Sequence, residues 1–142
     1  MIEQEIKFEL ESAADFSRFL EGLEAEAQMP ARLLSQTTHY PDTPELTPAG
    51  RLVMFRIRES SGVVITLKSG THVEDGYFRS SEVEAALDPA LLEGILARPR
   101  TVYGLDVAPV QALCHDFGEL QLECIGTLRN MRRVVVVDGH TV

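Results

Sequence analysis

The chain has 142 residues, of which 44% are hydrophobic, and a formal net charge of −9. This length suits one domain with its own core, while the excess of acid argues against a broad nucleic-acid surface, which needs clustered basic residues. No apolar run reaches the roughly 20 residues that cross a bilayer, and the N-terminus is acidic rather than signal-like. We therefore expect a cytoplasmic single domain over residues 1–142 that binds neither duplex nucleic acid nor membrane.

The first ten residues alternate with a period of two. Ile2, Gln4, Ile6, Phe8 and Leu10 would share one side of a strand, and Glu3, Glu5, Lys7 and Glu9 the other. A helix would group Ile2, Ile6 and Leu10 but turn Phe8 away from them, so the pattern favours a strand. For one strand alone, the charged side is more often a solvated face. The alternative is that two carboxylates hold Mg²⁺ or Mn²⁺ while the lysine binds an anion.

The next elements follow from caps and periodicity. Ser12 to Asp15 resembles a capping box, which predicts a helix from about Ala13 to Glu24. Residues 33–40 are typical of a strand, which the Pro41–Pro44 stretch would end, and a turn-rich loop follows to Gly50.

The segments 52–58 and 63–68 predict a hairpin. A three-residue loop with Gly62 in the left-handed conformation would pair Arg58 with Val64, Arg56 with Thr66 and Met54 with Lys68. In that register one face carries the cations and the other is apolar. A two- or four-residue loop would split the cations between the faces and mix them with the apolar set, so the hydrophobic pattern selects the three-residue loop.

The second half alternates strand and helix. Residues 77–86 predict a strand with Glu82 and Glu84 on one side, and a polar loop is expected before it, up to Gly76. Asp88 and Pro89 predict a helix start, and a second helix is expected over about 107–117. Residues 119–137 indicate a further strand, and Asp138-Gly139 a hairpin turn. Because only three residues follow that turn, the edge at 134–137 would stay unpaired, which predicts a homodimer.

These motifs together carry a resemblance. The motifs are Glu3, Glu5 and Lys7; Tyr40-Pro41-Asp42-Thr43-Pro44; Arg56 and Arg58; Thr66 and Lys68; Glu82 and Glu84; and the arginine-bearing tract 126–133. In order and spacing they are similar to the CYTH family, the triphosphate tunnel metalloenzymes. The resemblance implies an α+β fold dominated by antiparallel β structure, an eight-stranded tunnel with helices outside. Family members continue beyond the turn at 138–139, so the last strands of the tunnel are expected to be missing.

The resemblance also implies roles for residues. Glu3, Glu5, Glu82 and Glu84 would hold Mg²⁺ or Mn²⁺, directly or through water. The phosphate oxygens of a triphosphate would be bound by Lys7, Arg56, Arg58, Lys68, Arg129 and Arg132, although 129 and 132 have opposite parity in a regular strand. Tyr40 and Lys68 match a proposed base-assisting pair of thiamine triphosphatases; Tyr40 could equally be a core aromatic residue.

The expected function is metal-dependent hydrolysis of a triphosphate: inorganic tripolyphosphate, thiamine triphosphate or a nucleoside triphosphate. Two alternatives stay open, a non-catalytic polyphosphate- or nucleotide-binding module and a class IV adenylate cyclase. The motifs concern the binding of phosphate and metal only, so they do not identify the organic part of the substrate.

Overall fold

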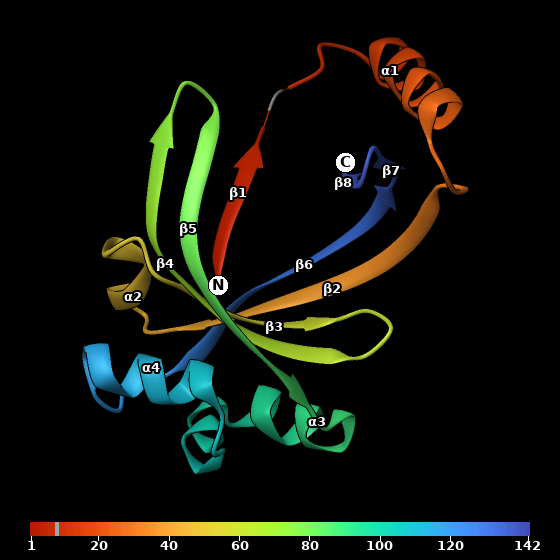
Figure 1. Ribbon diagram of the computed structural model, residues 1–142. Helices are drawn as coiled ribbons and strands as arrows, with labels where there is room; N and C mark the ends of the chain where they lie inside the picture. Colours follow the sequence, from red (N-terminus) through yellow and green to blue (C-terminus); the bar gives the residue numbers. More distant parts are fainter. Residues whose placement is uncertain (8) are drawn as a thin grey trace.

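A computed structural model describes residues 1–7 and 9–142 and shows one strongly curved antiparallel sheet (Figure 1). Its strand order is β1-β5-β4-β3-β2-β6. The strands are β1 (Ile2–Ile6), β2 (Arg32–Asp42), β3 (Met54–Glu59), β4 (Val63–Glu74), β5 (Tyr77–Leu87) and β6 (Glu123–Val134), and a separate hairpin is formed by β7 (Val136–Val137) and β8 (His140–Thr141). Phe8, predicted on the apolar side of the first strand, lies outside the described residues.

The helices lie outside the sheet, as predicted. They are α1 (Ala13–Glu26), α2 (Thr47–Gly50), α3 (Pro89–Ala97), the 3₁₀ helix η1 (Pro99–Gly104) and α4 (Ala108–Phe117). The Ser12 hydroxyl accepts from the Asp15 N–H at 3.1 Å, and the Asp88 carboxylate accepts from the Ala90 N–H at 2.9 Å. These side chains satisfy N–H groups of the first helical turn, so both predicted caps are confirmed.

The core lies on one side of the sheet, between the strands and the α3, η1 and α4 helices drawn below them in Figure 1. Phe55 and Ile57 of β3 and Ile65 of β4 point into it, and Val102 and Leu113 of the helical layer meet them. All five have at most 2% of their surface exposed. Since side chains alternate along a strand, the residues between the core positions must project from the opposite, concave face.

The predicted register of the β3–β4 hairpin is confirmed. Met54 pairs with Lys68, Arg56 with Thr66 and Arg58 with Val64. The prediction that Gly62 is left-handed is wrong, because Gly62 is not among the glycines with positive φ. The Ser60 N–H donates to the Gly62 carbonyl at 2.9 Å, so the three-residue loop closes without that conformation.

Several boundaries differ from the predictions. β1 ends at Ile6, β2 continues through Asp42, and the turn-rich segment contains the single-turn helix α2. β4 does not end at Lys68 but continues to Glu74 through an irregularity between Ser69 and His72. β6 begins at Glu123 rather than at 119. An irregular pairing of this kind bends a strand without ending it, which period-two patterns do not reveal.

The C-terminal turn has the predicted form, but the edge next to it is paired. Asp138 and Gly139 have φ values of 49° and 79°, as tight hairpin turns require. Val135 and Val142 exchange N–H···O bonds of 2.9 and 2.8 Å. The reason given for a homodimer is therefore absent, and dimerisation itself stays a prediction. In the described part of the chain β1 and β6 are instead the free edges of the six-stranded sheet, which does not close into a tunnel.

No helix in residues 1–7 and 9–142 is long and apolar enough to cross a membrane.

Candidate functional site

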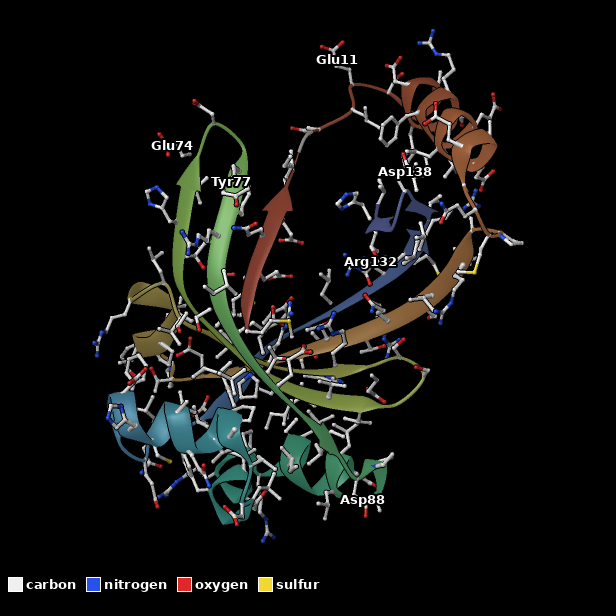
Figure 2. All side chains as sticks on the ribbon, in the orientation of Figure 1. Glu11, Glu74, Tyr77, Asp88, Arg132 and Asp138 are labelled. Carbon is white, nitrogen blue, oxygen red and sulfur yellow. The ribbon has the colours of Figure 1, made fainter. Side chains whose placement is uncertain are left out.

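The concave face of the sheet encloses a cavity of about 700 Å³. The sequence-predicted residues that line it come from six strands or their ends: Glu3, Glu5, Lys7, Tyr40, Arg56, Arg58, Lys68, Glu82, Glu84 and Arg132. Figure 2 shows side chains of β1, β5, β4 and β3 gathered on this side, with Arg132 labelled on β6. The structure thus brings together every predicted site residue except one.

The exception is Arg129. It pairs with Thr37 of β2, which in turn pairs with Glu59 of β3, whereas Arg132 pairs with Leu34. The two arginines are three positions apart in the sequence, so they have opposite parity, and no register shift falls between them. Arg129 therefore lies on the convex face, and a phosphate group in the cavity is out of its reach.

Cations and carboxylates pair with each other inside the cavity. Arg56 lies 2.9 Å from Glu82, and Arg58 lies 3.3 Å from Glu84. Lys68 bonds to Glu3 and lies 3.7 Å from Glu5, which also pairs with Lys7 at 3.1 Å. The Glu84 carboxylate also accepts a hydrogen bond from the Thr66 hydroxyl at 3.1 Å. β1 and β5 supply the acids and β4 and β3 the cations, so the concave face can hold this many charges because each cation reaches a carboxylate across one intervening strand.

One donor in this network is unsatisfied. The Nε–H of Arg56 is buried and has no hydrogen-bond partner among the described residues. The same guanidinium uses its Nη2 atom for Glu82. A buried N–H without a partner costs free energy, on the order of 1–3 kcal/mol, unless an acceptor reaches it. An acceptor on a bound ligand that reached this N–H would remove that cost.

The carboxyl groups of Glu82 and Glu3 have opposite pKa shifts. Burial, a hydrogen bond with Glu3 and the negative charge of Glu3 raise the pKa of Glu82 to about 7, against the attraction of Arg56. Burial also acts to raise the pKa of Glu3, but hydrogen bonds with Lys68 and Glu82 outweigh it and lower that pKa. Below about pH 7 the two groups therefore share one proton, which resides on Glu82.

This shift predicts a pH dependence of stability. Because the pKa of Glu82 is higher in the folded than in the unfolded protein, the folded state retains a proton that the unfolded state releases. The free energy of unfolding should fall, on the order of 1 kcal/mol, as the pH rises from about 4.5 to about 7. Urea unfolding of the metal-free protein at pH 5, 6, 7 and 8 measures it.

The Glu82→Gln variant is the control for this dependence, because glutamine keeps the shape and hydrogen bonds of the protonated acid. Its stability should fall less than that of the wild type over the same range. Identical slopes for the two proteins would show that Glu82 does not carry the proton.

The Tyr40–Pro44 motif has a local role in shaping the cavity. Asp42 is 5% exposed, and its carboxylate accepts from the N–H groups of Thr43 at 2.6 Å and Ala49 at 3.1 Å. These bonds hold helix α2 against the end of β2. The sequence reasoning missed this role, although aspartate before a turn is a common acceptor for backbone N–H groups.

Comparison with known proteins identifies the family to which this fold belongs. The CYTH domain profile matches residues 1–142, the whole chain. The chain belongs to the CYTH domain family. None of the curated proteins compared with it gave a match.

Solved structures share the CYTH architecture at low sequence identity. A Hippeastrum protein, described as an adenylyl cyclase candidate with a dominant triphosphatase activity, has a TM-score of 0.84 and 23% identity over 99% of this chain and 69% of its own. An adenylate cyclase candidate from Bacillus halodurans gives 0.61 and 18%, over 99% and 74%. Another from Vibrio parahaemolyticus gives 0.51 and 12%, over 99% and 65%. At these identities the likeness concerns the fold.

The donor set of this CYTH cavity fits a divalent metal in chemical type. Carboxylates are hard oxygen donors that suit Mg²⁺ and Mn²⁺, and two carboxyl groups that share a proton form a pair in which a cation can replace it. Within the described residues, no three His, Cys, Asp or Glu side chains are already arranged around one metal position. Arg56, Arg58 and Lys68 instead form ion pairs with these carboxylates. A metal would therefore bind only as these cations move to another anion.

Proposed function

We propose that this protein is a divalent-metal-dependent hydrolase of triphosphate-containing substrates. The observation that carries the proposal is the pairing of cations with carboxylates in one cavity, where the buried Nε–H of Arg56 has no acceptor among the described residues. A solvated sheet face would need neither the enclosure nor a buried donor of this kind.

Substrate binding is an exchange of ionic partners. Triphosphate oxygens would replace Glu82, Glu84 and Glu3 as the partners of Arg56, Arg58 and Lys68. Lys7 and Arg132, from the two edge strands, would bind the outer phosphates. Arginine suits this task because its planar fork gives two parallel bonds to one phosphate.

The carboxylates released in this exchange form the metal site. Glu3, Glu5, Glu82 and Glu84 would hold Mg²⁺ or Mn²⁺, directly or through water. When bound, the metal neutralises phosphate charge and polarises the phosphoryl group for attack. Binding should also expel the proton that resides on Glu82, because a protonated carboxyl is a poor metal ligand.

Lys68 and Tyr40 are the residues that we propose to position the water molecule that attacks the phosphoryl group. Lys68 is 12% exposed in its side chain and lies between Glu3 and Glu5, so its ammonium is fixed in the centre of the cavity. Tyr40 lines the same cavity from β2. Lys68 would orient the water and offset charge that develops on the phosphate, and Tyr40 would accept or pass on a hydrogen bond.

Two other functions can use this site. A class IV adenylate cyclase is favoured by the description of the three similar structures as adenylate or adenylyl cyclase candidates. A non-catalytic binding module is favoured by the open sheet, which leaves the cavity less enclosed than a tunnel.

One panel separates the three functions. Tripolyphosphate, thiamine triphosphate and ATP are each incubated with Mg²⁺ or Mn²⁺, and phosphate, pyrophosphate and cyclic AMP are measured. Phosphate release that requires the metal supports the hydrolase. Cyclic AMP with pyrophosphate indicates the cyclase, and binding without any product indicates the module.

A matched pair of variants tests the cavity assignment on β6. Arg132→Gln should weaken tripolyphosphate binding about 10-fold, because one charge-assisted contact is lost. Arg133→Gln changes the next residue, which faces away and pairs with Glu24 at 3.5 Å, so binding should stay within about 2-fold. Calorimetric titration measures both affinities. Equal losses would mean that β6 acts only through its overall charge.

A further inference from the structure

A second group of polar side chains lies on the convex face of the sheet, away from the cavity. His39 of β2 pairs with Ile57 of β3 on one side and with Thr127 of β6 on the other. Ile57 belongs to the core, and directly paired residues project from the same face, so all three side chains are convex. His39 is 8% exposed and takes no part in the triphosphate chemistry proposed above. This buried imidazole therefore needs an explanation of its own.

Both ring nitrogens of His39 are hydrogen-bonded. Nε2 lies 2.8 Å from a carboxylate oxygen of Glu59, and Nδ1 lies 3.0 Å from the hydroxyl oxygen of Thr127. An ionised carboxylate can only accept hydrogen bonds, so Nε2 carries a proton, and Nδ1 of the neutral ring accepts from the hydroxyl. The three side chains form a hydroxyl–imidazole–carboxylate relay. In this arrangement a base is positioned to take the hydroxyl proton, and an acid orients the base.

The members of the relay differ in exposure. His39 is buried, whereas Thr127 is exposed and the Glu59 side chain is 42% exposed. A set of hydrogen bonds that served only to hold three strands together would be strongest if all its members were shielded from water. Here the hydroxyl is open to a reactant while its base is shielded. That is the arrangement which a nucleophile requires.

A bulge gives Thr127 its direction. The register between β2 and β6 shifts between Tyr40 and Pro41, so Ile125 is an extra residue of β6 without a partner in β2. In a regular strand Thr127 and Cys124, three positions apart, would lie on opposite faces. The bulge brings them together, and the Cys124 Sγ atom lies 4.0 Å from the Thr127 hydroxyl. Bulges re-aim side chains in this way and are frequent beside active sites.

Arg129 places a positive charge beside the hydroxyl. It lies two residues after Thr127 on the same face of β6, is exposed, and its side chain makes no hydrogen bond or ion pair within residues 1–7 and 9–142. Thr37, which pairs with both Arg129 and Glu59, separates these two charges. A guanidinium binds phosphate oxygens through two parallel bonds. A phosphoryl group brought to Thr127 would therefore meet a cation that the cavity does not use.

We propose that Thr127 is a nucleophile that accepts the phosphoryl group of a small activated donor of the acyl phosphate class. The Thr127 oxygen forms a bond to phosphorus, and the bond from phosphorus to the carboxyl oxygen of the donor breaks. The carboxylate leaves with that electron pair. The hydroxyl proton moves to Nδ1 of His39, Glu59 stabilises the imidazolium, and Arg129 binds the phosphoryl oxygens. The imidazolium then releases its proton to water, and phosphothreonine remains on the convex face.

The test uses acetyl phosphate as the donor, with EDTA present so that metal-dependent hydrolysis in the cavity does not contribute. Peptide mass spectrometry and phosphorus NMR measure phosphothreonine at position 127. Wild-type protein and Thr127→Ser should be modified there, and Thr127→Val should not. His39→Gln should react about 100-fold more slowly, since a positioned general base contributes a factor of 10²–10⁴.

Two substitutions at exposed positions keep the test valid if His39→Gln does not fold. Glu59→Gln keeps an acceptor for the Nε2–H of His39 but removes the charge that stabilises the imidazolium. Arg129→Gln removes the cation beside the phosphoryl group. Each should slow the modification about 10-fold, the usual effect of losing one charge-assisted contact. Thermal unfolding checks that both variants are folded.

Ser35→Ala is the matched control. Ser35 is an exposed hydroxyl on the convex face of β2, and no imidazole or carboxylate bonds to it within the described part of the chain. Its substitution should leave the modification of Thr127 unchanged.

Three results would overturn the proposal. The first is a wild-type protein without phosphothreonine at position 127, or one in which Ser35 is modified as fast as Thr127. The second is a wild-type rate in the folded Glu59→Gln and Arg129→Gln variants, since Thr127 would then react only because it is exposed. The third is acetylthreonine in place of phosphothreonine, which would show attack on carbon rather than on phosphorus. None of these results bears on the cavity, because metal and triphosphate are absent from the assay.

Discussion

Arg56→Lys should lower kcat/KM for metal-dependent tripolyphosphate cleavage about 100-fold, since losing one preorganised donor costs a factor of 10²–10³. Lysine keeps the positive charge and can still pair with Glu82. It lacks the Nε–H that is buried without a partner, and it lacks the planar fork that binds phosphate in two places. Steady-state kinetics with Mg²⁺ or Mn²⁺ measure the effect.

The control for that change is Arg18→Lys, since Arg18 is exposed on α1, away from the cavity, and pairs there with Asp15. It should leave kcat/KM unchanged. A lysine at position 56 that supports wild-type kinetics would mean that charge alone matters at this position, and that the unpartnered Nε–H has no role in substrate binding.

Leu113→Ala should reduce the free energy of unfolding by about 3 kcal/mol, the usual cost of truncating a fully buried leucine. Leu113 is 0% exposed and joins α4 to the convex face of the sheet. The cavity is on the other face, so the affinity of the folded variant for tripolyphosphate should not change. Urea unfolding and calorimetry together measure the two quantities.

Ile6→Ala provides the comparison for Leu113→Ala. Ile6 is 73% exposed on β1, so its truncation should cost less than about 0.5 kcal/mol. If both substitutions cost the same, the core does not lie where the structure has it. If Leu113→Ala weakens ligand binding in the folded protein, the helical layer contributes to the site.

The parts of the site that the sequence predicted are those governed by period two. Arg56 and Lys68 share a face because the apolar residues that alternate with them must face the core, and the register of the three-residue loop satisfies both strands. The same parity separates Arg129 from Arg132. The assignment of Arg129 to the phosphate site followed the resemblance rather than the parity, and the structure places it on the convex face.

The parts that escaped prediction depend on contacts distant in sequence. The left-handed φ of Leu52 opposes the intrinsic preference of leucine and exists because α2, anchored by Asp42, imposes it. The bulge at Ile125 arises between β2 and β6, which are some 80 residues apart in the chain. Patterns within one segment carry no information about either.

The ion pairs of the cavity were also not predicted. The sequence analysis named every residue that takes part in them, but as a ligand of metal or phosphate. The residue types indicated carboxylates for a metal and cations for phosphate. In a protein without either ligand, Arg56, Arg58 and Lys68 are each satisfied by an opposite charge that projects from the same concave face, one strand beyond the adjacent one. The carboxylates and cations that indicated a metal and a phosphate are therefore the same groups that neutralise one another when neither is bound.

The charges on the two free edges of the described sheet are largely neutralised within the chain itself. On β1, Glu3 and Glu5 pair with Lys68 and Lys7, and on β6, Arg133 pairs with Glu24. What these edges still offer to another chain is therefore backbone N–H and C=O groups rather than a field of one sign. Dissolved salt, which screens charges, would change such a backbone contact little.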